Sequence, residues 1–265
     1  MQTVKWYCVK RIQMRIYPLS EGSFTIDHSK VFVPFETATH QLQDRPKGSI
    51  LVEIQPFVVV TDTDIILFDT GLGYFNKEGI LQLHDNLMKV GIDPSSVTKV
   101  FMSHLHKDHA GGMSYVHPVY NERFISFPYA KHYVQKREFE YAMSGESPSY
   151  LKEQVSLLAD FSGVVWLTED EGTIDDCIHY KLTAGHSLYH QVAWIKEGAT
   201  TFFFGGDVAP QLQQMKSKFV AKYDMDGKTS MEWRQLWWEQ AAKEQWTFAF
   251  YHDIQYPTYL PNPVV

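Results

Sequence analysis

The sequence predicts an α/β fold in which two β-sheets pack face to face and helices cover their outer surfaces. Three observations lead to this prediction. Strand-like and helical segments alternate along the 265 residues. The same alternation appears on both sides of the middle of the chain. Segments that contain histidine and aspartate follow several predicted strands, as expected where strand ends meet at one edge of a sandwich.

The strands of the first half are short apolar or β-branched runs bounded by Gly, Asp or Pro. We predict them at residues 11–17, 51–61, 65–69 and 99–102. Residues 81–90 have the spacing of an amphipathic helix that ends at Gly91, and residues 93–96 form the loop to the next strand. Residues 20–47 show no clear periodicity, so we expect either a surface meander or a lid near a functional site.

The second half repeats the alternation. Strands are predicted at residues 123–127, 164–167, 178–182, 192–195, 201–204 and 246–251. Helices are predicted at residues 129–143, 150–160 and 230–244. In the last of these helices, Trp233, Leu236, Trp237 and Ala241 share one apolar face, which we expect to be buried.

The composition is that of a globular protein with a full core, because 44% of the residues are hydrophobic and 21% are charged. We expect one domain that spans residues 1–265. The net charge of −7 argues against an extended nucleic-acid footprint. We expect no membrane span, since no run approaches roughly 20 apolar residues. Cys8 and Cys177 lie far apart and outside any metal-binding pattern, so we expect no disulfide framework and a cytoplasmic protein.

Four side chains that can bind metals fall within six residues, directly after the predicted strand at 99–102. They are His104, His106, Asp108 and His109. Strand-like alternation puts the first two histidines on the same side, and the other two residues follow one turn later, within reach of a second ion. Imidazoles with one carboxylate suit zinc or a similar first-row ion better than calcium or magnesium. The alternative is a histidine-rich loop in solvent.

Five motifs, taken together and in order, resemble those of the metallo-β-lactamase superfamily. They are a strand ending in Asp69-Thr70-Gly71, the cluster at 104–109, Gly185-His186-Ser187, Gly205-Gly206-Asp207 and Tyr251-His252-Asp253. The resemblance covers nearly the whole chain. It implies the αββα four-layer sandwich of this superfamily, with a metal site at one edge of the two sheets.

The resemblance also implies ligands for two metal ions. His104, His106 and His186 would hold the first ion, Asp108, His109 and His252 would hold the second, and Asp207 would bridge the two. Asp69 would orient a ligand histidine, as carboxylates behind metal ligands commonly do. Asp253 either has a similar supporting role or binds a backbone amide. His190 is expected to be structural.

Two adjacent divalent ions lower the pKa of a shared water, so that a bridging hydroxide becomes available as a nucleophile near neutral pH. We therefore expect a metal-dependent hydrolase of small molecules, without an organic cofactor, in which Asp108 or Asp207 handles a proton. Zinc is the expected metal, and manganese, iron and cobalt accept the same ligands.

Within the superfamily, the final motif and the size of the chain are most similar to quorum-quenching lactonases, which open N-acyl homoserine lactones. The chain departs from them at residues 185–190, where many lactonases have Gly-His-Thr-Pro-Gly-His. It also has Pro210 where some lactonases have a tyrosine that binds the lactone carbonyl. We expect Tyr189 or Tyr251 to replace that tyrosine.

The main alternative is an organophosphate or aryl-ester hydrolase, because phosphotriester-hydrolysing relatives share the same metal motifs. A thioesterase similar to glyoxalase II is disfavoured, since no C-terminal helical substrate domain is evident. A non-catalytic metal-binding module stays open, because a fold alone does not establish a function. A homodimer, the commonest oligomeric assembly, is compatible with the sequence.

Overall fold

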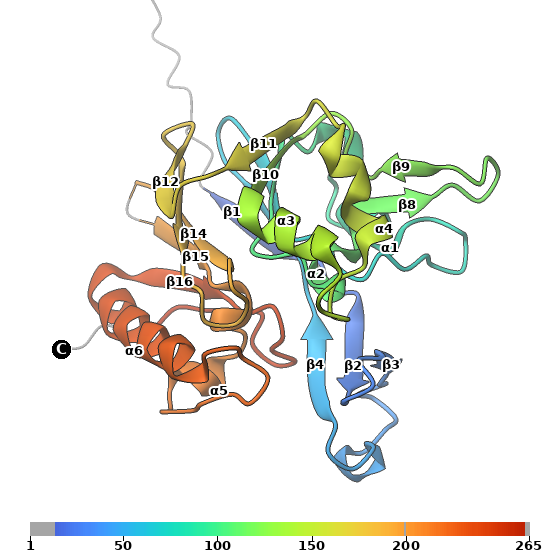
Figure 1. Ribbon diagram of the computed structural model, residues 1–265. Helices are drawn as coiled ribbons and strands as arrows, with labels where there is room; N and C mark the ends of the chain where they lie inside the picture. Colours follow the sequence, from blue (N-terminus) through green and yellow to red (C-terminus); the bar gives the residue numbers. More distant parts are fainter. Residues whose placement is uncertain (1–13, 199, 263–265) are drawn as a thin grey trace, which may run out of the picture.

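The structure is a computed structural model that describes residues 14–198 and 200–262. Cys8 and the first part of the strand predicted at 11–17 lie outside the described residues. Two six-stranded sheets form the centre of the molecule, and a three-stranded and a two-stranded sheet lie beside them (Figure 1). Among the described residues, the longest helix is too polar to cross a membrane, and the other helices are too short.

The first six-stranded sheet is built from the first half of the chain and the segment that follows it. In spatial order its strands are β1 (Arg15–Pro18), β5 (Phe57–Val60), β6 (Ile65–Phe68), β7 (Lys99–Phe101), β10 (Lys131–Gln135) and β11 (Val164–Leu167). The first three strands are antiparallel, and β6, β7, β10 and β11 run parallel to one another. The carboxyl ends of β6 and β7 therefore lie at the same edge.

The second six-stranded sheet follows the order of the sequence. Its strands are β12 (Glu171–Ile174), β13 (Ile178–Leu182), β14 (Gln191–Glu197), β15 (Thr200–Phe204), β16 (Trp246–Ala249) and β17 (Thr258–Tyr259). Only the β15–β16 pair is parallel. The carboxyl ends of these two strands therefore also meet at one edge.

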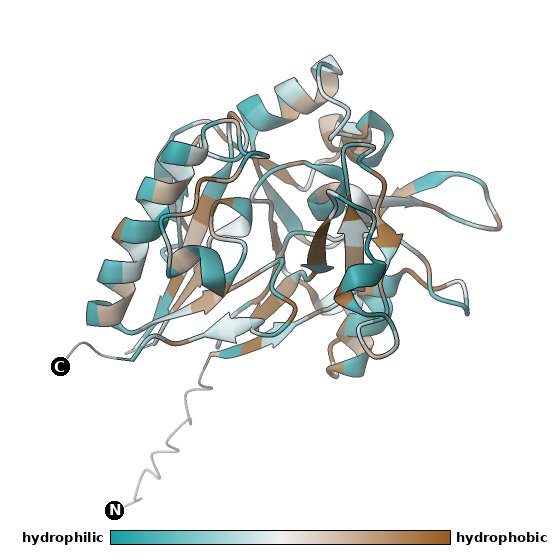
Figure 2. Cartoon of the chain, turned by 90° about the horizontal axis from the view of Figure 1, so that it is seen from below, coloured by the Kyte–Doolittle hydropathy of each residue, from teal (hydrophilic) through white to brown (hydrophobic). Residues whose placement is uncertain are grey.

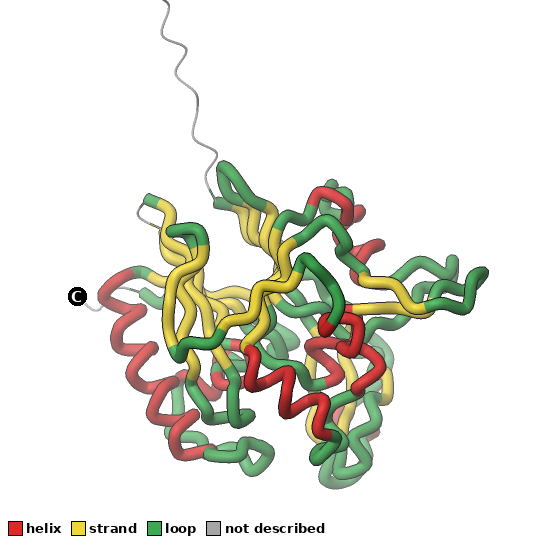
Figure 3. The backbone as a smooth tube through the Cα atoms, turned by 45° about the horizontal axis from the view of Figure 1, so that its top comes forward, coloured by secondary structure: helices red, strands yellow, loops and turns green. Residues whose placement is uncertain are grey.

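The remaining elements are short, with one exception. The helices are α1 (Gln82–Lys89), α2 (Lys107–Ala110), α3 (Lys136–Ser144), α4 (Lys152–Val155), α5 (Leu212–Met215) and α6 (Gly227–Glu244). The smaller sheets contain β2 (Gly22–Ile26), β3 (Val33–Pro34) and β4 (Ile50–Ile54), and β8 (Ser114–Val116) with β9 (Arg123–Ile125). Figure 3 shows the two main layers of strands between layers of helices.

Three apolar clusters separate these layers, and β6 shows how the strand period creates the first two. Phe68 points between the sheets, where its ring centroid lies 5.1 Å from that of Phe202 and 5.2 Å from that of Phe204 on β15. Leu67 points to the opposite face, as alternation requires, and joins a cluster with Leu87 of α1. One strand thus contributes to the core between the sheets and to the core under the helices.

The third cluster covers the outer face of the second sheet. There Phe203 of β15 packs on Trp237 of α6, with 4.9 Å between ring centroids. Helices, sheet, sheet and helix follow one another, so the predicted αββα sandwich is confirmed. Hydropathy colouring shows hydrophobic residues along the strands and hydrophilic ones on much of the helical surface (Figure 2).

Three local predictions were wrong. Residues 131–135 form the strand β10 rather than the first part of a helix, because this segment is inserted between β7 and β11 and four of its five residues are buried. The strand predicted at 51–61 is divided at Gln55-Pro56 into β4 and β5, which belong to different sheets.

The third wrong prediction concerns the apolar face of the long helix. Leu236 on α6 is 51% exposed, since the buried stripe of this helix contains Arg234, Trp237 and Ala241.

The segment at 20–47 is not a plain meander. It supplies β2 and β3, and β2 pairs with β4 over five residues. In Figure 1 this small sheet projects below the main sandwich. The pairing anchors the segment to the core, because β4 continues through Pro56 into β5 of the first sheet.

We predict that Phe68→Ala lowers the free energy of unfolding by about 3–5 kcal/mol, because it removes a fully buried ring from the core between the sheets. Urea denaturation measures the change. Tyr129→Ala is the control, since Tyr129 is 79% exposed, and it should change the free energy by less than about 0.5 kcal/mol. Equal losses in the two variants would contradict the assigned core.

Candidate metal centre

The five sequence motifs meet at one edge of the sandwich because each follows a strand that ends there. Asp69 follows β6, the cluster at 104–109 follows β7, and His186 lies in the loop between β13 and β14. Asp207 and His252 come just after the parallel strands β15 and β16. Residues that are almost 200 positions apart in the chain are thereby brought into one cluster.

Tight turns bring these side chains to the edge. Asp69 and Ala184 have φ angles of 56° and 50°, in the left-handed region that non-glycine residues rarely adopt. Gly206, directly before Asp207, has a φ of 47°. A Cβ atom at Gly206 would lie 2.7 Å from Nε2 of His190, so both the backbone angle and the lack of space require glycine there.

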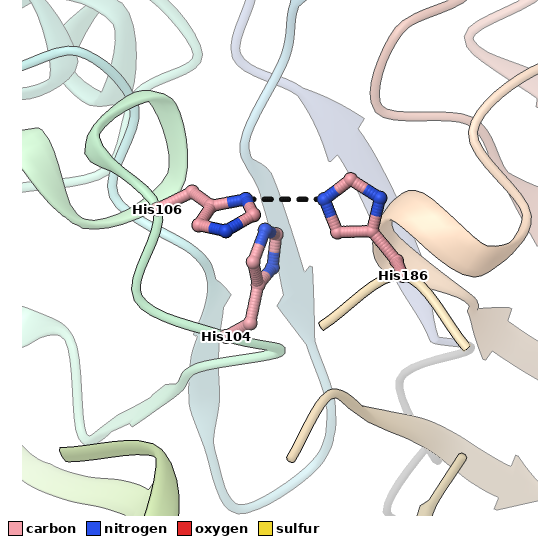
Figure 4. Close-up of side chains that lie close together, drawn as sticks. All are labelled: His104, His106 and His186. Carbon is pink, nitrogen blue, oxygen red and sulfur yellow. Dashed lines mark hydrogen bonds between the residues drawn. The ribbon is translucent and has the colours of Figure 1, made fainter. Parts of the chain in front are cut away.

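The first group of possible ligands consists of three histidines. One ring nitrogen each from His104, His106 and His186 lies within 4.8 Å of the others. Figure 4 shows the rings facing a common point, with 3.1 Å between Nδ1 of His106 and Nε2 of His186. Nε2 of His104 is buried and has no hydrogen-bond partner among the residues that the structure describes. Such a group can hold one divalent cation.

A second group lies beside the first. Asp108, His109 and His252 also offer one ligand atom each within 4.8 Å of one another. Asp207 lies between the groups: its Oδ1 is 3.0 Å from Nε2 of both His109 and His252, and its Oδ2 is 3.2 Å from Nε2 of His186. One carboxylate therefore faces both groups, which is the placement that a bridging ligand needs. The role of these residues as ligands stays a prediction.

The electrostatics of the two groups differ. Burial and the neighbouring histidines lower the pKa of His104 and of His106 well below the ordinary value, which favours the neutral form that binds metal. Burial also disfavours charge on His109 and His252, but Asp207 and Asp108 outweigh it and raise the pKa of both. The carboxylates thus favour positive charge at this end of the site, and a divalent cation would supply it. The donor set therefore fits two such ions.

Hydrogen bonds from behind orient three of the histidines. Nδ1 of His109 lies 2.6 Å from Oδ2 of Asp69, and Nδ1 of His186 lies 2.9 Å from Oδ1 of Asp224. Nδ1 of His252 lies 2.7 Å from the backbone carbonyl oxygen of Glu53. Each contact directs the Nε2 atom of its ring toward the centre of the cluster.

Some predicted site residues have other contacts. Asp253 contacts no ligand imidazole within the described part of the chain, and its carboxylate accepts hydrogen bonds from the backbone N–H groups of Leu212, Gln255 and Tyr256. Its carboxylate therefore binds backbone amides, which is one of the two roles expected for it. His190 accepts a hydrogen bond from the backbone N–H of Asp207 at 3.1 Å, in keeping with a structural role.

Neither tyrosine expected to contact substrate lies at the wall of the pocket over the site. Tyr251 is fully buried, stacks on His109 and donates a hydrogen bond to the backbone oxygen of Asp108 at 2.6 Å. Tyr189 lies under the guanidinium group of Arg137, at 5.4 Å from its ring centroid. These placements do not support a role for either residue in orienting a substrate carbonyl.

The sequence motifs did not reveal several residues that support the site. Besides Asp224, Glu138 of α3 accepts hydrogen bonds from the backbone N–H of Leu105, at 3.1 Å, and from the hydroxyl of Ser187. One buried carboxylate therefore ties the loop of His104 and His106 to the loop of His186. Only the contacts in space identify such residues, because they occupy ordinary positions in helices and loops.

Arg234 of α6 has a comparable role on the other side. Its buried guanidinium donates hydrogen bonds to the backbone oxygens of Val208, next to Asp207, and of Phe219. Phe219 belongs to the segment between α5 and α6 that also contains Asp224. The long helix thus fixes the turn of the bridging carboxylate and the segment that orients His186.

A pocket of about 350 Å³ opens above the two groups. His106, Asp108, His186, Asp207 and His252 line its floor. One wall comes from β2 and β4 and from the connections before and after β3. The other comes from α5 and the segments that flank it. The segment at 20–47 therefore lines the site, whereas its expected role as a lid stays a prediction.

Known proteins of similar sequence include lactonases. The chain is 27% identical over 196 residues to an N-acyl homoserine lactonase of Bacillus sp., which covers 67% of this chain and 68% of that protein. It is 44% identical over 55 residues to N-acyl homoserine lactonase AttM of Azorhizobium caulinodans, which covers 21% and 17% of the two chains.

Solved structures show the same fold. One is described as a probable metal-dependent hydrolase from Staphylococcus aureus, with a TM-score of 0.77, 19% identity, and coverage of 96% of this chain and 94% of that one. Another is AidC, a dizinc quorum-quenching lactonase in complex with a product, N-hexanoyl-L-homoserine. It has a TM-score of 0.69, 20% identity, and coverage of 95% and 92%.

A model of the metallo-β-lactamase superfamily matches residues 53–252. The match includes both histidine-containing groups and Asp207. The chain therefore belongs to the metallo-β-lactamase superfamily.

Proposed function

We propose that this protein is a hydrolase that uses two divalent metal ions to open a lactone, of the N-acyl homoserine lactone kind. The observation that carries the proposal is the position of Asp207, whose two oxygens face the two histidine-containing groups at the floor of a pocket. Zinc is the metal we expect at both positions, and manganese, iron and cobalt are compatible with the same ligands.

When bound, the two cations would supply a water of lowered pKa as the nucleophile and would polarise the carbonyl oxygen of the ester. The residues of the chain provide the rest. Asp207 would keep the two groups in fixed relation, and Asp69 and Asp224 would hold His109 and His186 in the orientation that binds metal. Asp108 lines the pocket, and we assign to its carboxylate the transfer of a proton from the attacking water to the departing oxygen.

Two findings support a lactone as the substrate. The curated relatives described above are N-acyl homoserine lactonases, and one solved relative holds the opened product of such a lactone. The pocket wall includes apolar side chains from β2 and β4, such as Ile26 and Val52, which suit an acyl chain. Tyr223 lines the pocket from the segment between α5 and α6. It lies near His186, with 6.0 Å between ring centroids, and is better placed than Tyr189 or Tyr251 to contact a substrate.

A panel of substrates tests the proposal. The zinc- or manganese-loaded protein is assayed with N-hexanoyl homoserine lactone, a simple γ-lactone, paraoxon and S-lactoylglutathione, each with and without a chelator. We expect opening of the acylated lactone to be fastest and to be lost on chelation. Hydrolysis of paraoxon alone would support the metal site but overturn the assignment of a lactone as the substrate. A metal-loaded protein that hydrolyses none of the four compounds would contradict the proposal.

We predict that His106→Ala reduces lactone hydrolysis to the level seen with a chelator, because the first group loses one of three ligand atoms. Circular dichroism should show that the fold is retained. His179→Ala, at an exposed position on β13, serves as the matched control and should keep normal activity. Normal turnover by the His106 variant would refute the site.

Asp207→Ala should weaken both metal sites, since the side chain faces both groups. We expect fewer than two metal ions per chain after dialysis, measured by elemental analysis, whereas Asp160→Ala, at an exposed position, should leave the stoichiometry unchanged. Two ions retained by the Asp207 variant at wild-type affinity would argue against a bridging carboxylate.

Asp224→Asn should weaken zinc binding by about 10–100-fold, because a neutral amide is a poorer acceptor for Nδ1 of His186 than a carboxylate. Competition with a chromophoric chelator measures the affinity. Asp226→Asn is the control, since Asp226 caps α6 two residues away and asparagine caps helices equally well. Equal zinc affinities in the two variants would show that Asp224 does not support zinc binding.

A further inference from the structure

Three cationic side chains line the pocket above the metal groups. Lys30 and Arg45 come from the segment at 20–47, and Lys107 begins α2 between two of the predicted ligands. None of the three forms an ion pair within the part of the chain that the structure describes. Carboxylates do pair with other cations, for example Asp64 with Lys99 and Glu171 with Lys181.

The side-chain contacts of Lys107 and Arg45 are with neutral groups. Nζ of Lys107 donates a hydrogen bond to the backbone oxygen of Lys30, and it lies 5.9 Å from the ring centroid of Phe32. Nε of Arg45 donates a hydrogen bond to the backbone oxygen of Leu42 at 3.1 Å. The partners are neutral carbonyl groups and an aromatic ring. The positive charges therefore remain available for an anion.

Apolar side chains line the same pocket. Ile26, Ile50, Leu51 and Val52 come from β2 and β4, and Phe219 comes from the segment before α6. A ligand that fills the pocket would meet the metal groups at the floor, an apolar surface along the sheet and positive charge beside it. A neutral acyl lactone would leave the cations without partners.

We propose that the substrate carries an anionic oxygen group, a carboxylate or a phosphate, that is remote from the ester bond and is bound by Lys30, Arg45 and Lys107. This inference rests on the proposed hydrolysis of lactones or esters and specifies the class of substrate. The apolar spacer would lie against β2 and β4, and the ester would reach the metal groups. The substrate is then a lactone or ester of the proposed kind whose acyl chain carries an anionic group.

Three esters that share an acyl length test the inference with the metal-loaded protein. They are phenyl hexanoate, its analogue with a terminal carboxylate (6-oxo-6-phenoxyhexanoate) and its analogue with a terminal phosphate. We expect kcat/KM for at least one of the anionic esters to exceed that of the neutral ester at least about tenfold, which corresponds to about 1.4 kcal/mol. The more reactive of the two anionic esters identifies the anionic group.

Variants locate the group that recognises the charge. Lys30→Gln and Arg45→Gln should each reduce the ratio of kcat/KM for the anionic ester to kcat/KM for the neutral ester several-fold. Lys47→Gln is the matched control, because Lys47 lies in the same segment, is exposed and does not line the pocket. A preference that survives in both pocket variants would show that the anion binds at the metal groups and would overturn the inference. An equal loss of preference in the Lys47 variant would also overturn the inference, because it would indicate general electrostatic attraction of the anionic ester to the protein surface.

Binding of unreactive analogues separates this inference from the proposed function. Hexanamide and 6-amino-6-oxohexanoate are titrated into the loaded protein by calorimetry. Tighter binding of the carboxylate than of hexanamide, weakened by Lys30→Gln, supports the anion site even if no ester is hydrolysed. The absence of ester hydrolysis would overturn only the proposed function. Hydrolysis of all esters without preference, and equal binding of the two amides, would overturn the inference and leave the hydrolase proposal intact.

Discussion

The site depends on one carboxylate that is shared between two clusters of histidines. Asp207 lies 3.0–3.2 Å from ring nitrogens of His109, His252 and His186. Buried groups of this kind are stable only when their charges and hydrogen-bonding atoms are matched. The parallel pairing of β15 with β16 and the left-handed turn at Gly206 put the carboxylate in this position. The cation-binding chemistry that we propose therefore depends on how strands from the second half of the chain pair.

The supporting residues fix loops rather than contact a substrate. Glu138 joins the loops of the first histidine group through Leu105 and Ser187. Arg234 joins the turn of Asp207 to the segment that contains Asp224. These side chains come from helices that pack on the outer faces of the sheets. The outer layers of the sandwich thus hold the geometry at its edge, and substitutions far from the pocket should affect metal affinity.

The pocket is lined by two sets of residues, and only one of them belongs to the sequence motifs. Its floor consists of motif residues, whereas its walls come from β2, β4 and the segments around α5. The residues of the floor are suited to the hydrolysis that we propose, a reaction that many different substrates can undergo. The walls decide which molecule enters, and here they combine apolar side chains with Lys30 and Arg45. Chemistry and selectivity are therefore carried by different parts of the chain.

From the sequence, the alternation of strands and helices predicted two packed sheets with helices outside, and the spacing of His104, His106 and Asp108 indicated a metal site, because both patterns are local properties. The αββα arrangement and the addition of His186, Asp207 and His252 to the site came from the resemblance of five motifs to the metallo-β-lactamase superfamily. The sequence did not predict that residues 131–135 form a central strand, since burial between β7 and β11 overrides the local helical pattern. It also could not predict the role of Asp224 or the burial of Tyr251, because contacts across many residues have no local signature. Only the tertiary structure decided which side chains face the pocket.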